Sequence, residues 1–399
     1  MSAPLVLYDD ARARQFEPFA LTRPAGELRA GAELIRRRWE RATGSRATGF
    51  AGAPHLARFE EFDAPPAVSG TLAAGTILAN SRFAIALDAA PASESVWKCD
   101  GRVAAVRLSA ALDSAALADG SLTLEAQASG ASADVRGWWM DEVWSLTAQL
   151  SAMTTADIAV LAKGTDEPPS HAVVLGEHRA CVERGAYIEP YVVIDTTDGP
   201  VLIRDGARVS AFTRLVGPCV IGEHVQVGGG KVKNCSIGEH SRVHGEISGT
   251  IFIGYTNKGH DGFIGDSVFG RWVNTGAGSI TSNLKNSYGE VTLWTPRGSA
   301  KTGLTFLGSL VGDHAKLGIG TRLTTGCVVG AGANVFGSEM PPKFVPPFAW
   351  GDAPPFDDFA LDKFLEVAER VMHRRGVTLG ANERATLGAA WARRGEFRA

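Results

Sequence analysis

The second half of the chain carries a six-residue repeat of branched apolar residues. The repeat runs through two series of positions: Ile203, Val209, Leu215, Ile221 and Val227, and then Val311, Leu317, Leu323, Val329 and Val335. Four of these residues are followed directly by glycine, at Gly222, Gly312, Gly318 and Gly330. Neither a helix nor an ordinary strand produces a six-residue period. Hexapeptide repeats are typical of parallel β-helices, in which each unit forms one short wall of a triangular coil.

The repeat region is expected to span residues 171–338. Three hexads make about one coil of 18 residues, so the region can hold roughly eight or nine coils. Residues 283–305 break the repeat and are expected to leave the coil as a loop, which in solenoids tends to lie on the binding face. Prolines 341 and 342 are expected to end the coil, and residues 339–399 are expected to continue as a Pro-rich segment and two helices, at 359–375 and 381–394.

Residues 1–170 have the mixed pattern of an α/β domain. Short apolar runs predict strands at Leu5–Tyr8 and Thr76–Ala79, and longer periodic stretches predict helices at Glu27–Arg41 and Trp139–Ala152. The composition of residues 163–170 predicts a linker. The predicted architecture is therefore an α/β domain, a parallel β-helix and C-terminal helices.

Charge and cysteine usage exclude several classes of protein. The net charge of −3 gives no electrostatic reason to expect a nucleic-acid or membrane partner. The five cysteines are widely spaced and contain no C-x-x-C, which argues against a disulfide framework or a zinc site. The chain starts without a secretory apolar run, so we expect a cytoplasmic protein with reduced thiols. Flat coil walls associate readily, and a three-sided prism makes a homotrimer the simplest expectation.

An unusual density of Asn, Lys, His and Gly interrupts the apolar repeat between residues 248 and 294. His260 is flanked by glycines and is a candidate general base, because an imidazole titrates near neutrality. A hydrogen-bonded wall histidine is the alternative interpretation. Asn274 and Asn283 can orient a base or hold a substrate hydroxyl, or they can be corner residues that tolerate a left-handed turn.

The stretch from Ile253 to Val291, IGYTNKGHDGFIGDSVFGRWVNTGAGSITSNLKNSYGEV, resembles a known family. It is similar to the acetyltransferase half of the bifunctional N-acetylglucosamine-1-phosphate uridylyltransferase/glucosamine-1-phosphate acetyltransferase family (GlmU). The resemblance implies a left-handed β-helix. It also implies that His260 deprotonates the acceptor, that Asn274 orients His260 or the substrate, and that Asn283 contacts the sugar phosphate or the acyl donor.

The same resemblance implies acetyl-CoA as a co-substrate, with Ala300 and Gly318 lining its pantetheine arm between subunits. Two family tyrosines are replaced here, by Phe263 and Leu284, and the family lysine that holds the sugar phosphate is missing near residue 248. Lys258 or Lys285 is a candidate to replace that cation. These departures leave the acceptor sugar open.

The opening of the chain resembles sugar nucleotidyltransferases and a divergent bacterial branch of GlmU-like proteins. Residues 18–28, PFALTRPAGEL, look like the P-L-T…K-P element of those enzymes, which makes Thr22 and Arg23 candidate substrate-binding residues. Arg14, Arg23 and Arg29 are candidates to bind triphosphate oxygens, with a solvated helix face as the alternative. The Gly-rich phosphate loop of the family is absent after the first strand.

Asn80 stands where the family carries an Mg²⁺-binding aspartate, and we include it among the candidate substrate-binding residues. Mg²⁺ prefers carboxylates, so Asp9, Asp10, Asp141 and Asp157 are the alternative ligands, and the sequence does not choose among them.

Three functions remain open at this stage. The first is an enzyme of nucleotide-sugar synthesis that joins a sugar 1-phosphate to UTP or dTTP with Mg²⁺ and transfers an acyl group from acyl-CoA. The second is an acyltransferase capped by a degenerate nucleotide-binding domain. The third is a β-helix scaffold that binds a sugar nucleotide or a partner without catalysis.

Overall fold

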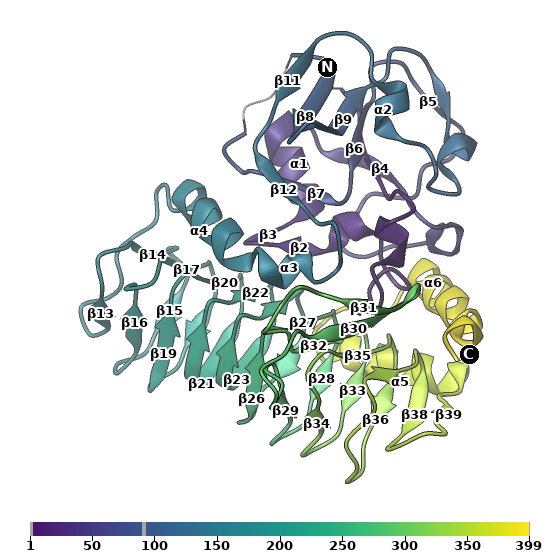
Figure 1. Cartoon of the computed structure of the whole chain (residues 1–399). Helices are drawn as coiled ribbons and strands as arrows, with labels where there is room; N and C mark the ends of the chain where they lie inside the picture. Colours follow the sequence, from purple (N-terminus) through teal and green to yellow (C-terminus); the bar gives the residue numbers. More distant parts are fainter. Residues whose placement is uncertain (1–2, 90–92, 399) are drawn as a thin grey trace.

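The computed structural model describes residues 3–89 and 93–398. An α/β unit formed by the first part of the chain lies above a long solenoid, and the C-terminal helices pack beside the far end of the solenoid (Figure 1). All five cysteines are free and buried. Within the described ranges, no helix is long and apolar enough to cross a membrane.

The α/β unit is built on a six-stranded sheet in the order β11-β8-β9-β6-β1-β4. Its strands are β1 (Leu5–Tyr8), β4 (Ala47–Ala51), β6 (Ile77–Asn80), β8 (Val96–Cys99), β9 (Arg102–Arg107) and β11 (Ser132–Asp134). Strand β1 pairs in parallel with β4 and β6, so Tyr8 lies opposite Asn80 at one edge. In open α/β sheets, ligands bind at the carboxyl ends of such strands.

The helix predicted at 27–41 is shorter than expected. Helix α1 covers only Ile35–Thr43, and the residues before it form a small hairpin of β2 (Arg29–Ala30) and β3 (Glu33–Leu34). The hairpin turns at Gly31, which has a φ of +61° that favours glycine. The buried apolar residues that suggested one helix therefore come from two elements.

The helix predicted at 139–152 is also displaced along the chain. Trp139 is held in a strand, β12 (Gly137–Trp139), where it pairs with Phe83. The helical part begins only after the following turn, as α3 (Ser145–Ala148) and α4 (Leu150–Leu161). The smaller elements of the unit are α2 (Leu124–Gln127), β5 (Thr71–Leu72), β7 (Phe83–Ile85) and β10 (Leu112–Asp113).

The solenoid is the parallel β-helix that the hexads predict, with the left hand that the family resemblance implies. One wall is a parallel sheet formed by β14 (Ala180–Val182), β17 (Val201–Ile203), β20 (Cys219–Ile221), β22 (Ser236–Ile237), β24 (Ile251–Phe252), β27 (Val268–Phe269), β32 (Ser309–Val311), β35 (Cys327–Val329) and β37 (Phe344–Val345). Every residue of the two hexad series is at most 2 % exposed. The repeat therefore marks the side chains that fill the prism.

Most strands of the other walls are equally short, and β21 and β23 are longer, with eight and seven residues. They are β13 (Val173–Leu175), β15 (Tyr187–Ile188), β16 (Val193–Asp195), β18 (Arg208–Val209), β19 (Thr213–Val216), β21 (Gln226–Lys233), β23 (Arg242–Ser248), β25 (Asn257–Lys258), β26 (Phe263–Gly265), β28 (Asn274–Thr275), β29 (Ile280–Thr281), β33 (Lys316–Leu317), β34 (Arg322–Leu323), β36 (Asn334–Val335), β38 (Ala349–Gly351) and β39 (Asp357–Asp358). The ladders continue past the prolines expected to end them, because β35 pairs with β37 and β36 pairs with β38.

The interruption at residues 283–305 leaves the prism, as predicted. It contains an antiparallel hairpin of β30 (Thr292–Thr295) and β31 (Gly298–Lys301), which rises toward the α/β unit (Figure 1). Behind it the coil closes without a gap, since β27 pairs directly with β32.

Both predicted C-terminal helices are present, as α5 (Leu361–His373) and α6 (Ala381–Ala392). Phe364 and Met372 of α5 are buried against Phe348 and Trp272 of the coil. The indole of Trp391 donates a hydrogen bond to the backbone carbonyl of Phe359 at 2.8 Å. The helices therefore cover apolar side chains at one corner of the coil.

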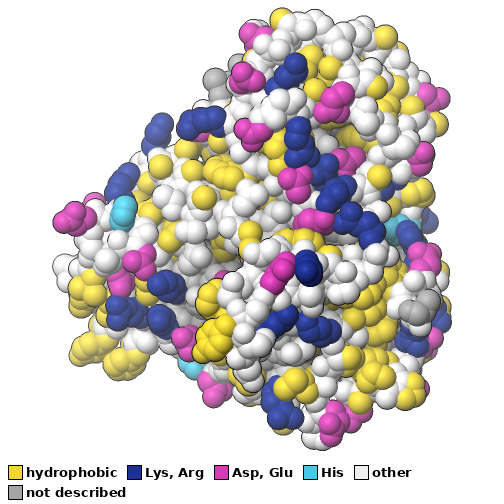
Figure 2. Space-filling view, in the orientation of Figure 1, with side chains coloured by type: hydrophobic (Ala, Val, Ile, Leu, Met, Phe, Trp, Pro, Cys, Tyr) yellow, Lys and Arg dark blue, Asp and Glu magenta, His cyan; other side chains and the backbone are white. Residues whose placement is uncertain are grey.

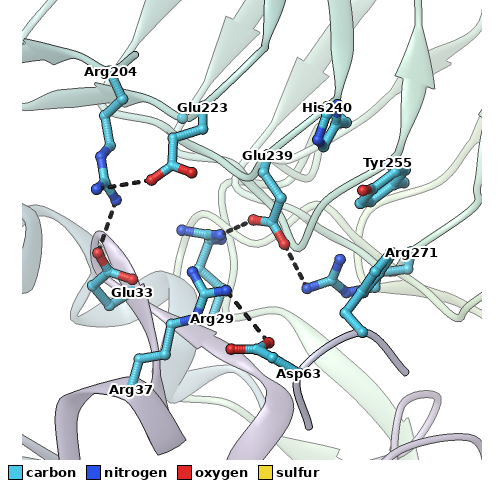
Figure 3. A pocket seen from close by; sticks show the side chains of 12 residues that line it. Arg29, Glu33, Arg37, Asp63, Arg204, Glu223, Glu239, His240, Tyr255 and Arg271 are labelled. Carbon is cyan, nitrogen blue, oxygen red and sulfur yellow. Dashed lines mark hydrogen bonds and ion pairs between the residues drawn. The ribbon is translucent and has the colours of Figure 1, made fainter. Parts of the chain in front are cut away.

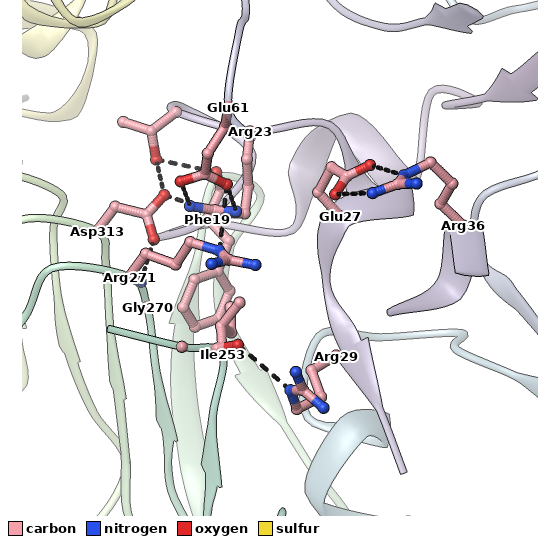
Figure 4. Close-up of polar contacts among 12 residues, drawn as sticks. Phe19, Arg23, Glu27, Arg29, Arg36, Glu61, Ile253, Gly270, Arg271 and Asp313 are labelled. Atoms are coloured by element: carbon pink, nitrogen blue, oxygen red, sulfur yellow. Dashed lines mark hydrogen bonds and ion pairs between the residues drawn. The ribbon is translucent and has the colours of Figure 1, made fainter. Parts of the chain in front are cut away.

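A buried ion network joins the α/β unit to the β-helix (Figure 4). The guanidinium of Arg23 donates to Glu61 at 2.9 and 3.2 Å and to Asp313 of the coil at 2.8 Å. Arg271 of the coil lies 3.2 Å from Glu61 and 2.6 Å from Glu239. Arg23, Asp313 and Arg271 are each about 2 % exposed. Burial alone would raise the pKa of Glu61, but Arg23 and Arg271 outweigh it and hold that pKa below its usual range.

We predict that Arg23→Ala destabilises the protein by about 3–5 kcal/mol, because it leaves buried carboxylates without their cation. The free energy of unfolding, from denaturant titration of the whole chain, measures the loss. Arg46→Ala is the control, since Arg46 is exposed. A loss below about 1 kcal/mol, as expected of an exposed pair, would contradict the role of Arg23.

We also predict that acid weakens the docking of the two units. The pKa values of Glu61 and Glu239 are lowered in the folded protein, since two arginines beside each outweigh burial. Their stabilisation is present above the unfolded-state pKa of about 4.3 and is lost as the pH falls below it. Thermal unfolding between pH 7 and pH 3 measures this dependence. Arg23→Ala should flatten it, and an equal slope in both proteins would contradict the prediction.

Candidate functional site

The carboxyl ends of β1 and β6 border a pocket of about 350 Å³ in the α/β unit. Its polar lining includes Asp10, Asn80 and three arginines, Arg12, Arg82 and Arg102. Acidic and basic side chains alternate over the lower part of the unit, above the β-helix (Figure 2). We call this pocket the sheet-edge pocket.

Asp10 organises the floor of the sheet-edge pocket. Its carboxylate accepts hydrogen bonds from Arg82 at 2.6 Å and from the amide of Asn80 at 3.0 Å. Burial alone would raise the pKa of Asp10, but the hydrogen bonds and charge of Arg82 outweigh it and keep the pKa below its usual value. Asp10 is therefore an anion whose charge is already paired.

Ion pairs connect the rim of the pocket to the solenoid. Arg102 donates to Asp141 at 2.8 Å and stacks on the ring of Trp139 at 3.8 Å. Arg12 pairs with Glu142, and Arg297 at the tip of the β30–β31 hairpin donates to both oxygens of Glu142 at 2.9 Å. The hairpin inserted in the coil thus ends beside the sheet-edge pocket.

The candidate phosphate-binding residues from the sequence lie elsewhere. Arg14 donates to the backbone carbonyls of Asp9 at 2.9 Å and Leu117 at 2.7 Å, so it braces a loop. Thr22 donates to Asp313 at 2.6 Å and, with Arg23, belongs to the network between the two units. Of the candidate substrate-binding residues in this half of the chain, Asn80 lines the sheet-edge pocket, whereas Arg29 pairs with Glu239 of the coil.

Two of the four alternative Mg²⁺ ligands, Asp9 and Asp157, bind residues that do not line the pocket. Asp9 is buried and accepts from the backbone amide of Ala25 at 3.1 Å, and Asp157 pairs with Arg38. Asp10 lines the pocket and Asp141 pairs with arginines that line it, but both carboxylates contact Arg82, at 2.6 and 3.4 Å. A guanidinium therefore occupies the place where these carboxylates would hold a cation, and this donor set does not fit a resident Mg²⁺.

A second cleft, of about 750 Å³, lies on the coil wall beside the inserted segment. We call it the wall cleft. It combines the apolar residues Phe263, Ile280, Leu323 and Met340 with Lys285, Arg322 and Lys343. Lys285 donates to the carbonyl of Glu290, and Lys343 donates to the carbonyl of Thr292 at 3.2 Å. An apolar groove with three cations on its border suits a long ligand that carries phosphates.

His260 is exposed on a coil corner and lies three residues before Phe263 of the wall cleft. Its corner stacks on the next one, where the amide of Gly278 donates to the carbonyl of Asp261 at 3.3 Å. Asn274 accepts a hydrogen bond from Asn257 at 2.9 Å on the adjoining wall. Within the described ranges, no hydrogen bond joins Asn274 to His260.

The other candidates of the coil have structural partners. Lys258 is fully buried, and its ammonium donates to the carbonyls of His244 at 3.1 Å and Asp261 at 2.9 Å, as well as to that of His260. Burial lowers the pKa of Lys258 to about 8. The amide of Asn283 donates to Asp266 at 2.6 Å. Lys285 is the one candidate here that lines the wall cleft.

Ala300 lies in β31 opposite Leu293, and Gly318 accepts a hydrogen bond from the hydroxyl of Ser279 at 3.0 Å. Neither residue is part of the lining of the wall cleft. Sequence reasoning missed Arg12, Arg82 and Arg102 of the sheet-edge pocket and Arg322 and Lys343 of the wall cleft. The position of Arg82 two residues after the end of strand β6 is the signal that could have found it.

Comparisons with known proteins find a matching family model for the α/β unit and several curated relatives. Residues 5–166 match the family model of sugar nucleotidyl transferases. The bifunctional protein GlmU of Methanococcus vannielii is 35 % identical over 86 residues, 22 % of this chain and 20 % of that protein. A bifunctional sugar-1-phosphate nucleotidylyltransferase/acetyltransferase of Sulfurisphaera tokodaii is 32 % identical over 77 residues, 19 % of each chain.

The GlmU of Polaromonas naphthalenivorans is 26 % identical over 167 residues, 42 % of this chain and 29 % of that protein. The chain therefore resembles bifunctional nucleotidyltransferase/acetyltransferases of the GlmU type, although the matches span less than a third of the length of each relative.

Proposed function

We propose that the protein is a bifunctional transferase of nucleotide-sugar biosynthesis. In the α/β unit, a phosphate oxygen of a sugar 1-phosphate attacks the α-phosphorus of UTP or dTTP. The bond between the α- and β-phosphates breaks, and pyrophosphate leaves. In the β-helix, an amine or hydroxyl of a sugar attacks the thioester carbonyl of acetyl-CoA, and the CoA thiol leaves.

The observation that carries the first activity is the cationic pocket at the carboxyl ends of β1 and β6, within the segment that matches sugar nucleotidyl transferases. Arg12, Arg82 and Arg102 approach this pocket from three elements, and guanidinium groups match phosphate oxygens with two parallel hydrogen bonds. In-line phosphoryl transfer depends mainly on positioning and on neutralising the charge of the phosphates. These arginines supply that charge in place of the absent Gly-rich loop.

Mg²⁺ enters this proposal as part of the nucleotide substrate, chelated by its phosphates. No protein ligand set is assigned to it, because Arg82 already pairs with Asp10 and Asp141. Among the described residues, no group of three or more His, Cys, Asp and Glu side chains is arranged to hold a metal.

The acyl transfer is supported by the wall cleft and by the likeness of residues 253–291 to the acetyltransferase half of GlmU. Pantetheine would lie along Ile280 and Leu323, and the phosphates of CoA would meet Arg322 and Lys343. His260, which is exposed on the coil corner, takes the proton of the attacking acceptor. Ile319 and Phe336 are 78 % and 40 % exposed on the outer coil, which favours a homotrimer that covers them.

We predict that Arg102→Gln lowers kcat/KM for nucleotide-sugar formation by about 10- to 100-fold, because one charge-assisted contact to phosphate is lost. Mass spectrometry of protein, Mg²⁺, UTP or dTTP and a panel of sugar 1-phosphates measures the product. Arg107→Gln is the matched control, since Arg107 lies on the same strand but outside the pocket. Absence of a nucleotide sugar from the wild-type reaction would favour an acyltransferase with a nucleotide-binding cap.

We predict that His260→Ala slows acyl transfer by about 10²- to 10⁴-fold, the usual contribution of a general base. Release of CoA thiol from acetyl-CoA in the presence of each sugar phosphate measures the rate. His178→Ala, an exposed histidine at the start of the coil, is the control. Turnover by His260→Ala at the wild-type rate would overturn the assignment of this base, while nucleotidyl transfer should be unchanged in either variant.

A further inference from the structure

The seam between the α/β unit and the β-helix encloses a third pocket, separate from the sheet-edge pocket and the wall cleft. Its volume is about 260 Å³, enough for roughly eight or nine water molecules. The α/β unit contributes Arg29, Arg37 and Asp63 to its lining, and the coil contributes Glu239, Tyr255 and Arg271 (Figure 3). We call it the seam pocket.

Some charged groups of the seam pocket are fully engaged and form its walls. Arg29 donates to Glu239 at 2.5 Å and to the carbonyl of Ala32 at 2.6 Å. Arg204 lies 2.9 Å from both Glu33 and Glu223. These pairs hold the two sides of the pocket in place.

Other donors on the lining have incomplete hydrogen bonding. Arg271 is 2 % exposed, and its Nη2 contacts Glu239, but its Nη1 has no hydrogen-bond partner in the described part of the chain. The guanidinium of Arg37 reaches only Asp63, at 3.5 Å, which is too long for a normal hydrogen bond. Over the same residues, the hydroxyl of Tyr255 makes no hydrogen bond either. A buried donor without a partner is costly, so Arg271 indicates a ligand, and Arg37 and Tyr255 are half-buried donors beside it.

The chemistry of the lining restricts what that ligand is. Arg37 and Arg271 suit phosphate oxygens, which guanidinium groups bind with paired hydrogen bonds. Glu33 and Glu223 are also on the lining, and carboxylates accept hydrogen bonds from hydroxyls. A bare anion would bind only the two arginines, and a neutral sugar would bind only the two glutamates.

We propose that the seam pocket binds a small phosphorylated sugar, with its phosphate on Arg37 and Arg271 and its hydroxyls on Glu223 and Glu33. The site is additional to the two catalytic sites proposed above and does not depend on either activity. Because Arg37 belongs to α1 and Arg271 to the coil, the ligand contacts both units at once. Its binding therefore stabilises their docking by mass action.

Isothermal titration of the full chain without nucleotide or acyl-CoA tests the proposal, with glucose 1-phosphate, inorganic phosphate and glucose as probes. Glucose 1-phosphate should bind most tightly, phosphate more weakly, and glucose not measurably. Arg37→Gln should weaken the binding of glucose 1-phosphate about tenfold or more. Asp63→Asn should tighten it, because it releases Arg37 from a competing carboxylate and keeps an oxygen for Arg36, which lies 3.0 Å away.

Two further variants separate this site from the catalytic ones. Arg46→Gln, an exposed arginine just after α1, should bind glucose 1-phosphate like the wild type. Arg102→Gln should retain seam binding even where nucleotidyl transfer is lost, so the two proposals can fail independently. Equal affinities of wild type and Arg37→Gln, weakening by Asp63→Asn, or no binding of glucose 1-phosphate would each overturn the proposal. Phosphate binding as tight as that of glucose 1-phosphate would remove the role of the carboxylates.

Discussion

The relation between the two halves of the molecule depends on one buried guanidinium. Arg23 bonds to Glu61 in its own unit and to Asp313 in the coil, and Arg271 extends the chain of charges to Glu239. A buried pair is costly to form and more costly to break, since the partner left behind keeps its charge without water. The network therefore contributes less to overall stability than to the orientation of the two units, because their buried charges are paired in this arrangement. The seam pocket takes its shape from the same residues.

Several features were predictable because their cause is local. The hexad positions are the residues that point into the prism, so every sixth residue of the sequence fills the interior of the coil. Residues 361–373 and 381–392 become helices through ordinary apolar spacing. The break at 283–305 was visible for the same reason, since a segment without the repeat cannot fill a wall.

The roles of single residues were harder to predict, because they depend on contacts across the chain. Arg23 looked like a ligand of phosphate, and its partner Asp313 is 290 residues away in the sequence. Lys258 looked free to bind a substrate, but its ammonium is enclosed by carbonyls of the coil corners. The residues 27–41 contain good helix formers, yet the turn at Gly31 starts a hairpin before the helix can form. An arginine or lysine in a sequence states a charge, whereas its role is set by the carboxylates and carbonyls that the fold brings to it.

The hairpin β30–β31 leaves a coil whose ladder closes behind it, and its tip reaches the rim of the sheet-edge pocket through Arg297 and Glu142. The ladder of the solenoid therefore does not depend on the residues at the tip of this insertion. The residues at its tip can vary without changing the register of the ladders. Substitutions in this one loop can therefore change the contact between the two halves of the chain, while the strand register of both folds stays the same.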